Sequence, residues 1–344
     1  LSAPANTRSP NESSRMIPKR FLTGAFALLA SLSLAACSTA ATSSTGEPEL
    51  KTSAEAVTVG LTYIPNVQFS PVYLAEDEGL YKEAGLDATV RHHGSDEGLF
   101  TALLSGEENF VIASGDEALV AASQGMDLVS VGAFYSHHPG VVIVPASSPI
   151  HSLADLKGHF AALAAIQEAG LTTEDVVLTS IGYTQRAAIA QGSVDAVLGF
   201  SNNDLVQMQV AGLDVRAIPL KEDTPLVAAA MITTRAWAQA HPEATRALVQ
   251  ATSAGAALAV SDPEKALDST ATRDESLSDT NTRATAKAVL DATIPLLKNS
   301  SDQVSPVQDA DTWARMGDFL AKVPGLFQGP VDASKVMTNE YANN

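Results

Sequence analysis

The chain has 344 residues, of which 45% are hydrophobic, and it carries 39 acidic and 21 basic side chains. The net charge of −18 would repel nucleic-acid phosphates, and no run of Lys and Arg offsets it, which argues against nucleic-acid binding. A single cysteine excludes an internal disulfide, so a hydrophobic core has to hold the fold.

The N-terminal segment has the order of features that is typical of an export signal. Lys19 and Arg20 precede an apolar run at 21–34, which ends in small residues. This run is short for a helix that spans a membrane, so a retained membrane helix is the weaker interpretation. We therefore predict a signal peptide over 1–36, with no helix from it in the mature protein.

Cys37 follows this apolar run directly. The sequence at 34–37 resembles the bacterial lipobox, in which the cysteine is acylated after cleavage, so we predict an extracytoplasmic protein attached to the cell membrane by lipid on Cys37. Translation is expected to start at Met16, with 1–15 upstream of the true start. Removal of 1–36 leaves 17 basic and 38 acidic side chains, a net charge of −21. Residues 37–56, rich in Ser, Thr and Ala, are predicted to be a flexible tether.

From residue 57 onward, short β-rich runs alternate with helical patterns. This alternation predicts an α/β fold with parallel-rich sheets flanked by helices. Strands are expected at 57–61, 88–92, 110–113, 128–134 and 141–144, and helices at 70–78, 98–104 and 116–124. We assign 57–145 to a first lobe that these elements complete.

A second, smaller α/β region is predicted over 146–219. Its expected helices are at 152–156, 160–169, 184–191 and 204–211, and its strands are at 176–180, 194–199 and 215–219. A strand at 227–233 then returns to the first lobe, followed by helices at 235–240, 242–260, 282–297 and 311–320, with a helix start marked by Asp262 and Pro263. Lobe 1 is therefore 57–145 plus 220–344, and the two crossovers predict a hinge.

Polar and aromatic side chains follow the first predicted strand. In open α/β sheets ligands bind beyond the carboxyl ends of the strands, so this loop is a candidate site. The predicted ligand-binding residues are Tyr63, Asn66, Gln68, Phe69 and Tyr73. The amides can bind heteroatoms of a planar ring, and prolines fix the loop. The alternative is a rigid turn whose aromatic rings fill the core, most plausible for Tyr73.

Two further loops supply candidate residues. Ser114, Gly115 and Asp116 follow a strand and open a helix, so backbone N–H groups and Asp116 as N-cap are expected to meet polar ligand atoms. The alternative is a plain capping turn. A second set, Asn202, Asn203 and Asp204, is predicted to face the first lobe across the cleft, unless it serves only as turn chemistry.

The motifs resemble a known family. They lie at 63–66, 73–87, 181–185, 192–197, 199–204 and 338–341, and they are similar to the sulfonate and thiamine-pyrimidine-precursor (SsuA/THI5-like) group of ABC-transporter solute-binding lipoproteins. This resemblance implies a two-lobed periplasmic-binding-protein fold of the venus-flytrap, type II-like kind. Tyr183 joins the predicted site through the 181–185 motif.

The resemblance also implies a function. A small aromatic heterocycle, a thiamine pyrimidine precursor or a riboflavin-like compound, is expected in the interlobe cleft, with an ABC permease and its ATPase as partners. The protein is expected to be a monomer without cofactor. In place of the family's strand and Gly-rich loop, this chain continues from Gly158 straight into a helical pattern, so lobe 2 is predicted to lack about a dozen residues. A sulfonate or other organic solute, or a surface lipoprotein without transport function, are the alternatives.

Catalytic and metal-binding functions have little support in the sequence. The chain has no Gly-x-Ser-x-Gly, phosphate-loop or His-Glu-x-x-His motif, so we predict no catalytic residue, and a pyrimidine-synthase-like enzyme is the weakest alternative. The histidine pairs at 92–93 and 137–138 have acidic neighbours, which include Asp96, Glu97, Asp116 and Glu117. Adjacent strand residues point to opposite faces, so we predict no metal site.

Overall fold

The structure is a computed structural model that describes residues 54–94, 97–156, 170, 175, 184–221 and 224–343. Several predictions of the sequence lie outside these residues: the signal peptide, lipidation of Cys37, the helix at 160–169, the strand at 176–180, Tyr183 and the shortening after Gly158. No helix in the described part of the chain has both the length and the apolar composition to cross a membrane.

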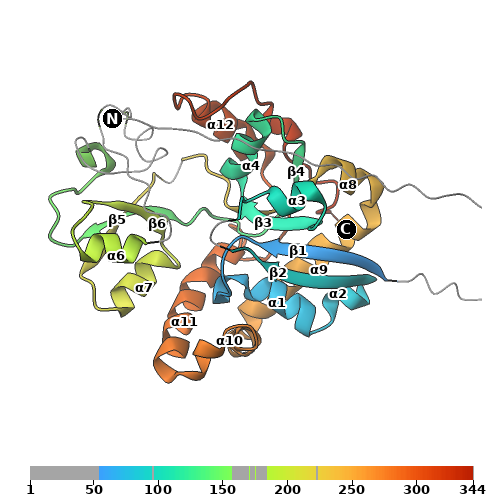
Figure 1. Ribbon diagram of the computed structural model, residues 1–344, viewed down its shortest axis with the longest axis horizontal. Helices are drawn as coiled ribbons and strands as arrows, with labels where there is room; N and C mark the ends of the chain where they lie inside the picture. Colours follow the sequence, from blue (N-terminus) through green and yellow to red (C-terminus); the bar gives the residue numbers. More distant parts are fainter. Residues whose placement is uncertain are drawn as a thin grey trace, which may run out of the picture. The chain divides into compact units, whose positions relative to one another are not determined.

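A five-stranded mixed sheet forms the centre of the large lobe (Figure 1). Its strand order is β2-β1-β3-β8-β4, and its strands are β1 (Glu55–Leu61), β2 (Leu86–His92), β3 (Phe110–Ser114), β4 (Leu128–Ala133) and β8 (Ala229–Thr234). β1 pairs in parallel with β2 and β3, whereas β8 is antiparallel to β3 and β4. The returning strand predicted at 227–233 is therefore confirmed, and it lies inside the sheet.

Helices cover both faces of this sheet, so its strands are apolar on both sides. α1 (Ser70–Asp77), α9 (Pro242–Ser261) and α10 (Pro263–Ala271) share one hydrophobic cluster with β1. On the other face, α3 (Thr101–Ser105), α4 (Gly115–Ser123) and α12 (Ala310–Leu320) pack against alternate residues of β3. Two shorter helices, α2 (Leu80–Glu83) and α8 (Arg235–Ala240), contact α9. The predicted helix start at Asp262 is confirmed, since its side chain accepts from Lys265 N.

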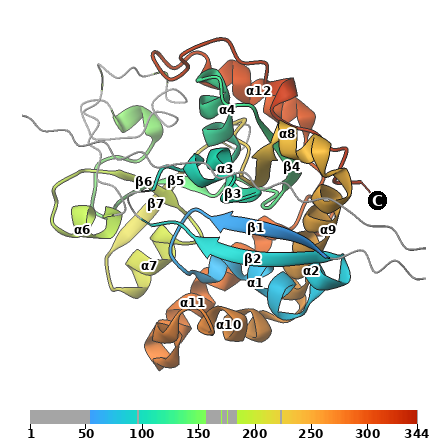
Figure 2. The same ribbon diagram turned by 45° about the vertical axis from the view of Figure 1, so that its right-hand side comes forward.

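The small lobe contains a three-stranded sheet of order β6-β5-β7 (Figure 2). Its strands are β5 (Gly140–Pro145), β6 (Val197–Phe200) and β7 (Val215–Pro219), and both pairings are antiparallel. Successive residues of β5 alternate between two clusters, as a strand requires. Val141 and Ile143 pack toward α6 (Gln185–Ala190) and α7 (Asp204–Val210), while Val142 and Val144 pack on the 3₁₀ helix η2 (Leu153–Leu156).

Two predictions about β5 are wrong. The prediction places it in lobe 1, which extends to residue 145, but among the described strands its partners are β6 and β7 of the small sheet. A run such as Val141–Val144 is apolar on both faces in either sheet, so composition cannot tell which sheet it joins. The described strands of the small sheet are also antiparallel, where a parallel-rich arrangement was expected. The segment 134–139 carries the chain from β4 to the small sheet, where β5 lies between β6 and β7.

The C-terminal helices return to the space beside both sheets. α11 (Thr280–Thr293) contacts α7 of the small lobe and the 3₁₀ helix η1 (Val67–Phe69) of the large lobe. The helix predicted at 282–297 extends four residues beyond the end of α11, because the chain changes to a 3₁₀ turn, η4 (Ile294–Leu297), where Pro295 has no N–H to donate. Two further 3₁₀ turns are η3 (Glu275–Ser278) and η5 (Ala333–Lys335).

Candidate functional site

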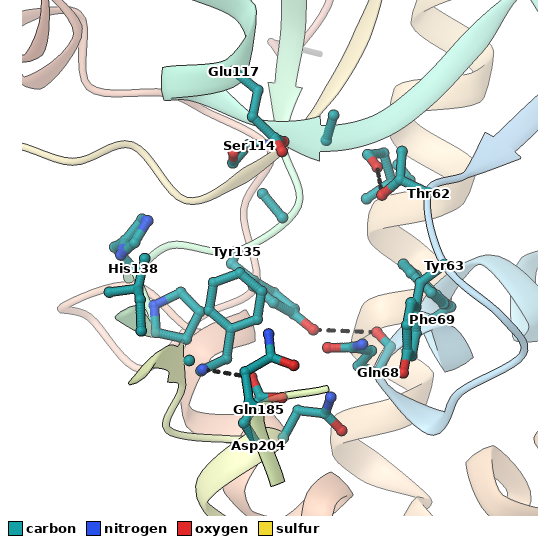
Figure 3. Close-up of a pocket in the computed structure, with 18 of the residues that line it drawn as sticks. Thr62, Tyr63, Gln68, Phe69, Ser114, Glu117, Tyr135, His138, Gln185 and Asp204 are labelled. Atoms are coloured by element: carbon teal, nitrogen blue, oxygen red, sulfur yellow. Dashed lines mark hydrogen bonds between the residues drawn. The ribbon is translucent and has the colours of Figure 1, made fainter. Parts of the chain in front are cut away.

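A cavity of about 460 Å³ lies between the large and the small sheet (Figure 3). This volume falls in the usual range for small-molecule sites, roughly 300–1,000 Å³. Its wall includes residues from the loop after β1, the β3–α4 corner, the 134–139 crossover, α6, β6 and α7. Six predicted site residues line it: Tyr63, Gln68, Phe69, Ser114, Asn203 and Asp204.

The loop after β1 is fixed by its own amide. Asn66 is the N-cap of η1, and its Oδ1 accepts a hydrogen bond of 3.0 Å from Gln68 N. This cap presents Gln68 and Phe69 to the cavity, and Tyr135 Oη donates to the Gln68 carbonyl at 3.3 Å. Asn66 itself does not line this cavity. Its Nδ2 instead donates to Asn203 Oδ1 across the two lobes at 3.4 Å.

Tyr73 lies in the core rather than in the cavity wall. Its side chain is fully buried on α1, where its hydroxyl is 3.1 Å from His92 Nε2. The Arg273 guanidinium lies 4.5 Å from the ring centroid. Burial raises the pKa of the Tyr73 hydroxyl well above its usual range. Direct contact with a ligand is therefore not supported for Tyr73, because the helix turns this side chain toward the sheet.

At the β3–α4 corner the predicted N-cap is wrong. Ser114, not Asp116, is the N-cap residue of α4, and Glu117 at the third helical position accepts from Ser114 N at 2.9 Å and Ser114 Oγ at 2.7 Å. Gly115 is buried, and a Cβ there would lie 2.6 Å from a Val227 side-chain carbon. Neither Gly115 nor Asp116 lines the cavity.

Glu117 lines the cavity next to Ser114. Its side chain is open to water in the hollow, yet the walls surround it with protein atoms that weaken its solvation. This desolvation, together with the neighbouring Asp116 carboxylate, raises the pKa of Glu117. A carboxylate in this setting gains free energy from any ligand group that donates a hydrogen bond to it.

The small lobe contributes polar groups from the turn between β6 and α7. Asp204 Oδ2 accepts from Phe200 N at 2.7 Å, and burial raises the pKa of Asp204. Asn203 Oδ1 accepts from Gln207 Nε2 at 2.6 Å. The residues of both pairs line the cavity, namely Phe200, Asn203, Asp204 and Gln207. Asn202 does not line it, because it is buried against α11, where its Nδ2 donates to Thr293 Oγ1 at 2.9 Å.

The sequence did not single out several residues of the wall. Phe134, Tyr135 and His138 lie in the crossover from β4 to β5, which the wrong placement of β5 treated as a loop within one lobe. The signal that could have found the first two is the aromatic pair Phe134 and Tyr135 at the end of the strand predicted at 128–134. Gln185 and Arg186 at the start of α6 also line the cavity.

The histidine pairs behave as the strand geometry predicted for 92–93. His92 faces the Tyr63 carbonyl, with Nδ1 at 2.8 Å, whereas His93 Nε2 lies 2.9 Å from Glu108 Oε1. His93, Glu97 and Glu108 bring possible ligand atoms within 4.8 Å of one another. Arg91 already fills this group, with Nη1 at 2.8 Å from Glu97 and 2.6 Å from Glu108.

Residues 66–266 match the family described as NMT1/THI5 like. Riboflavin-binding protein RibY of Chloroflexus aurantiacus is 27% identical over 325 residues, covering 89% of this chain and 90% of that protein. The formylaminopyrimidine-binding protein of Halalkalibacterium halodurans is 25% identical over 310 residues, covering 85% and 91%.

The fold is similar to that of the periplasmic aliphatic sulphonate binding protein SsuA from Escherichia coli. The two have a TM-score of 0.64 and 21% identity, with 83% of this chain and 92% of that chain covered. The family match spans more than half of the sequence, and the mixed sheets with flanking helices agree with the periplasmic-binding-protein fold. The chain therefore belongs to the NMT1/THI5-like family.

Proposed function

We propose that this protein is the extracytoplasmic solute-binding component of an ABC importer. The observation that carries the proposal is one cavity whose wall takes side chains from both lobes, such as Gln68 from the large lobe and Asp204 from the small one. A ligand that contacts both walls stabilises the arrangement in which they face each other, which couples binding to a change of conformation.

The proposed ligand is a small aromatic heterocycle. Five aromatic side chains line the cavity, namely Tyr63, Phe69, Phe134, Tyr135 and Phe200. Phe200 is 41% exposed, which is unusual for a large apolar side chain in a concave wall and favours stacking on a flat guest. Two relatives support this class of ligand, because they are named as a riboflavin-binding protein and a formylaminopyrimidine-binding protein.

The remaining parts of the proposal concern the setting of the protein. Lipid on Cys37 would hold it at the outer face of the cell membrane, and a permease with its ATPase would receive the ligand from the monomer. Binding without catalysis is proposed, since hydrogen bonds within the protein already engage the polar groups of the wall at Ser114, Asn203 and Asp204.

Thermal unfolding with a panel of riboflavin, 4-amino-5-hydroxymethyl-2-methylpyrimidine and taurine tests this proposal. A ligand at a hundredfold its dissociation constant should raise the free energy of unfolding by about 2.7 kcal/mol. Phe200→Ala should reduce the effect of an aromatic ligand, whereas Val307→Ala should not, because Val307 is 49% exposed but does not line the cavity. If neither heterocycle stabilises the wild-type protein, the proposed ligand class is wrong.

A further inference from the structure

The cavity has an open hydrogen-bond acceptor at the β3–α4 corner. Both hydrogen bonds from Ser114 reach the same oxygen of Glu117, Oε2. Among the hydrogen bonds formed by the described residues, none ends on Oε1 of Glu117. Figure 3 shows Glu117 and Ser114 extending from this corner toward the cavity. Oε2 of Glu117 is therefore held by Ser114, while Oε1 has no hydrogen-bond partner among the residues that the structure describes.

The same corner is unfavourable for an anion. The N-terminus of a helix attracts negative charge, but Asp116 and Glu117 already occupy the first turn of α4. Asp116 Oδ1 is buried and has no hydrogen-bond partner. No ion pair among the described residues joins a basic side chain to Asp116 or Glu117. A sulfonate at this corner would lie beside the Glu117 carboxylate, which costs free energy in a partly dehydrated hollow. The basic side chain in the described wall, Arg186, comes from α6 of the small lobe.

A hydrogen-bond donor faces the same cavity from the crossover. His138 Nδ1 accepts from Gly140 N at 3.0 Å, so the proton of the neutral ring is on Nε2. Burial lowers the pKa of His138, although the Asp116 carboxylate acts in the opposite direction. The wall thus offers a fixed acceptor at Glu117 and a donor at His138, both lining the space drawn in Figure 3.

We propose that Glu117 Oε1 accepts a hydrogen bond from an N–H group on the ring of the ligand, so that the cavity selects amino- or imide-bearing heterocycles over sulfonates. This inference rests on the proposed function, since it assumes that the cavity binds a heterocycle. It adds the chemical group that the ligand must carry and the residue that recognises it. Hydrogen bonds to a charged acceptor in a shielded site are among the stronger ones, and a ligand without the N–H leaves the carboxylate unpaired.

Calorimetric titration with two matched pairs of probes tests the inference on the wild-type protein. The pairs are 4-amino-5-hydroxymethyl-2-methylpyrimidine with the same pyrimidine lacking the amino group, and riboflavin with its 3-methyl derivative. In the pair that binds, the N–H-bearing probe should bind about 10-fold to 100-fold more tightly than its partner. Taurine should bind more weakly than either probe of that pair. This comparison needs no substitution, so it stands even where a variant fails to fold.

Glu117→Gln is the matched variant. The glutamine oxygen can still accept from Ser114, while its NH₂ group replaces the open acceptor with a donor. Affinity for the N–H-bearing probe should fall about 10-fold to 100-fold, and affinity for its partner should change less than about threefold. Equal losses for both probes, or no loss, would overturn the role of Glu117 while leaving the proposed function intact. Failure of all four heterocycles to bind wild type would overturn the proposed ligand class and this inference together.

Discussion

Glu108 is a buried carboxylate whose charge is compensated by its neighbours. It is 1% exposed, and it contacts both Arg91 and His93 in the large lobe. The space for it comes from Gly60 on β1, where a Cβ would lie 2.2 Å from Glu108 Oε2. A buried charge that loses its partners is costly, so the absence of a side chain at Gly60 supports the whole group.

Gly60→Ala should therefore destabilise the protein by about 3–5 kcal/mol, because the added methyl group displaces the Glu108 carboxylate from Arg91 and His93. Urea-induced unfolding followed by circular dichroism measures this change. Gly94→Ala is the control, since a Cβ at Gly94 meets nothing within 4 Å. Equal stabilities of the two variants would show that Glu108 adapts without cost.

At the level of single residues, the site was only partly predictable from the sequence. Polar and aromatic residues after strands were correctly singled out, and Gln68, Phe69 and Asn203 do line the cavity. The sequence does not distinguish the buried Tyr73 from these cavity residues, because the direction in which a helix points one side chain depends on what packs against it. Glu117 is absent from the predicted ligand-binding residues, because its capping bond to Ser114 and its place in the wall depend on the fold.

At the level of elements, most strands and helices followed from their apolar patterns. The strands β3 and β7 and the helix α8 begin where the sequence predicted. The apolar patterns did not indicate to which sheet a strand belongs, as β5 demonstrates, because strand pairing depends on the fold of the whole chain. The residue composition of a strand indicates how buried its side chains are, and a strand inside either sheet is equally buried.

The contact between α1 and α9 is close enough to require a glycine. A Cβ at Gly255 would lie 2.0 Å from the Pro71 carbonyl oxygen. Gly255→Ala would gain about 1 kcal/mol in helix propensity, but the overlap with a backbone atom forces the helices apart. We expect a net loss of roughly 1–3 kcal/mol in thermal unfolding. Ser253→Ala on the same helix is the control, and a Gly255→Ala protein that is more stable than wild type would contradict the close contact.

At the level of the whole molecule, side chains join the two lobes near the cavity. Asn66 hydrogen-bonds Asn203, and Asn202 donates to Thr293 at the end of α11. Thr293 is fully buried, so this bond is shielded from water. These contacts hold the small lobe against the large one and set how readily a ligand can bind between them.

Thr293→Val should weaken ligand binding, because it keeps the side-chain shape and leaves Asn202 Nδ2 without its acceptor. The unpaired buried donor costs about 1–3 kcal/mol in the arrangement that brings the lobes together. Calorimetric titration with the panel heterocycle that binds wild type measures the change in affinity. Thr293→Ser retains the hydroxyl and should bind much more like wild type, and the reverse order would exclude this role for Thr293.

The claim that a ligand occupies the cavity between the sheets is tested most directly by filling that cavity. Ala229 on β8 lines it, and Ala229→Trp would place an indole ring in the space that a heterocycle would take. Calorimetric titration should show that wild type binds a panel heterocycle at one molecule per chain, while a folded Ala229→Trp protein binds none. Retention of wild-type affinity by this variant would place the ligand elsewhere on the protein and contradict the account.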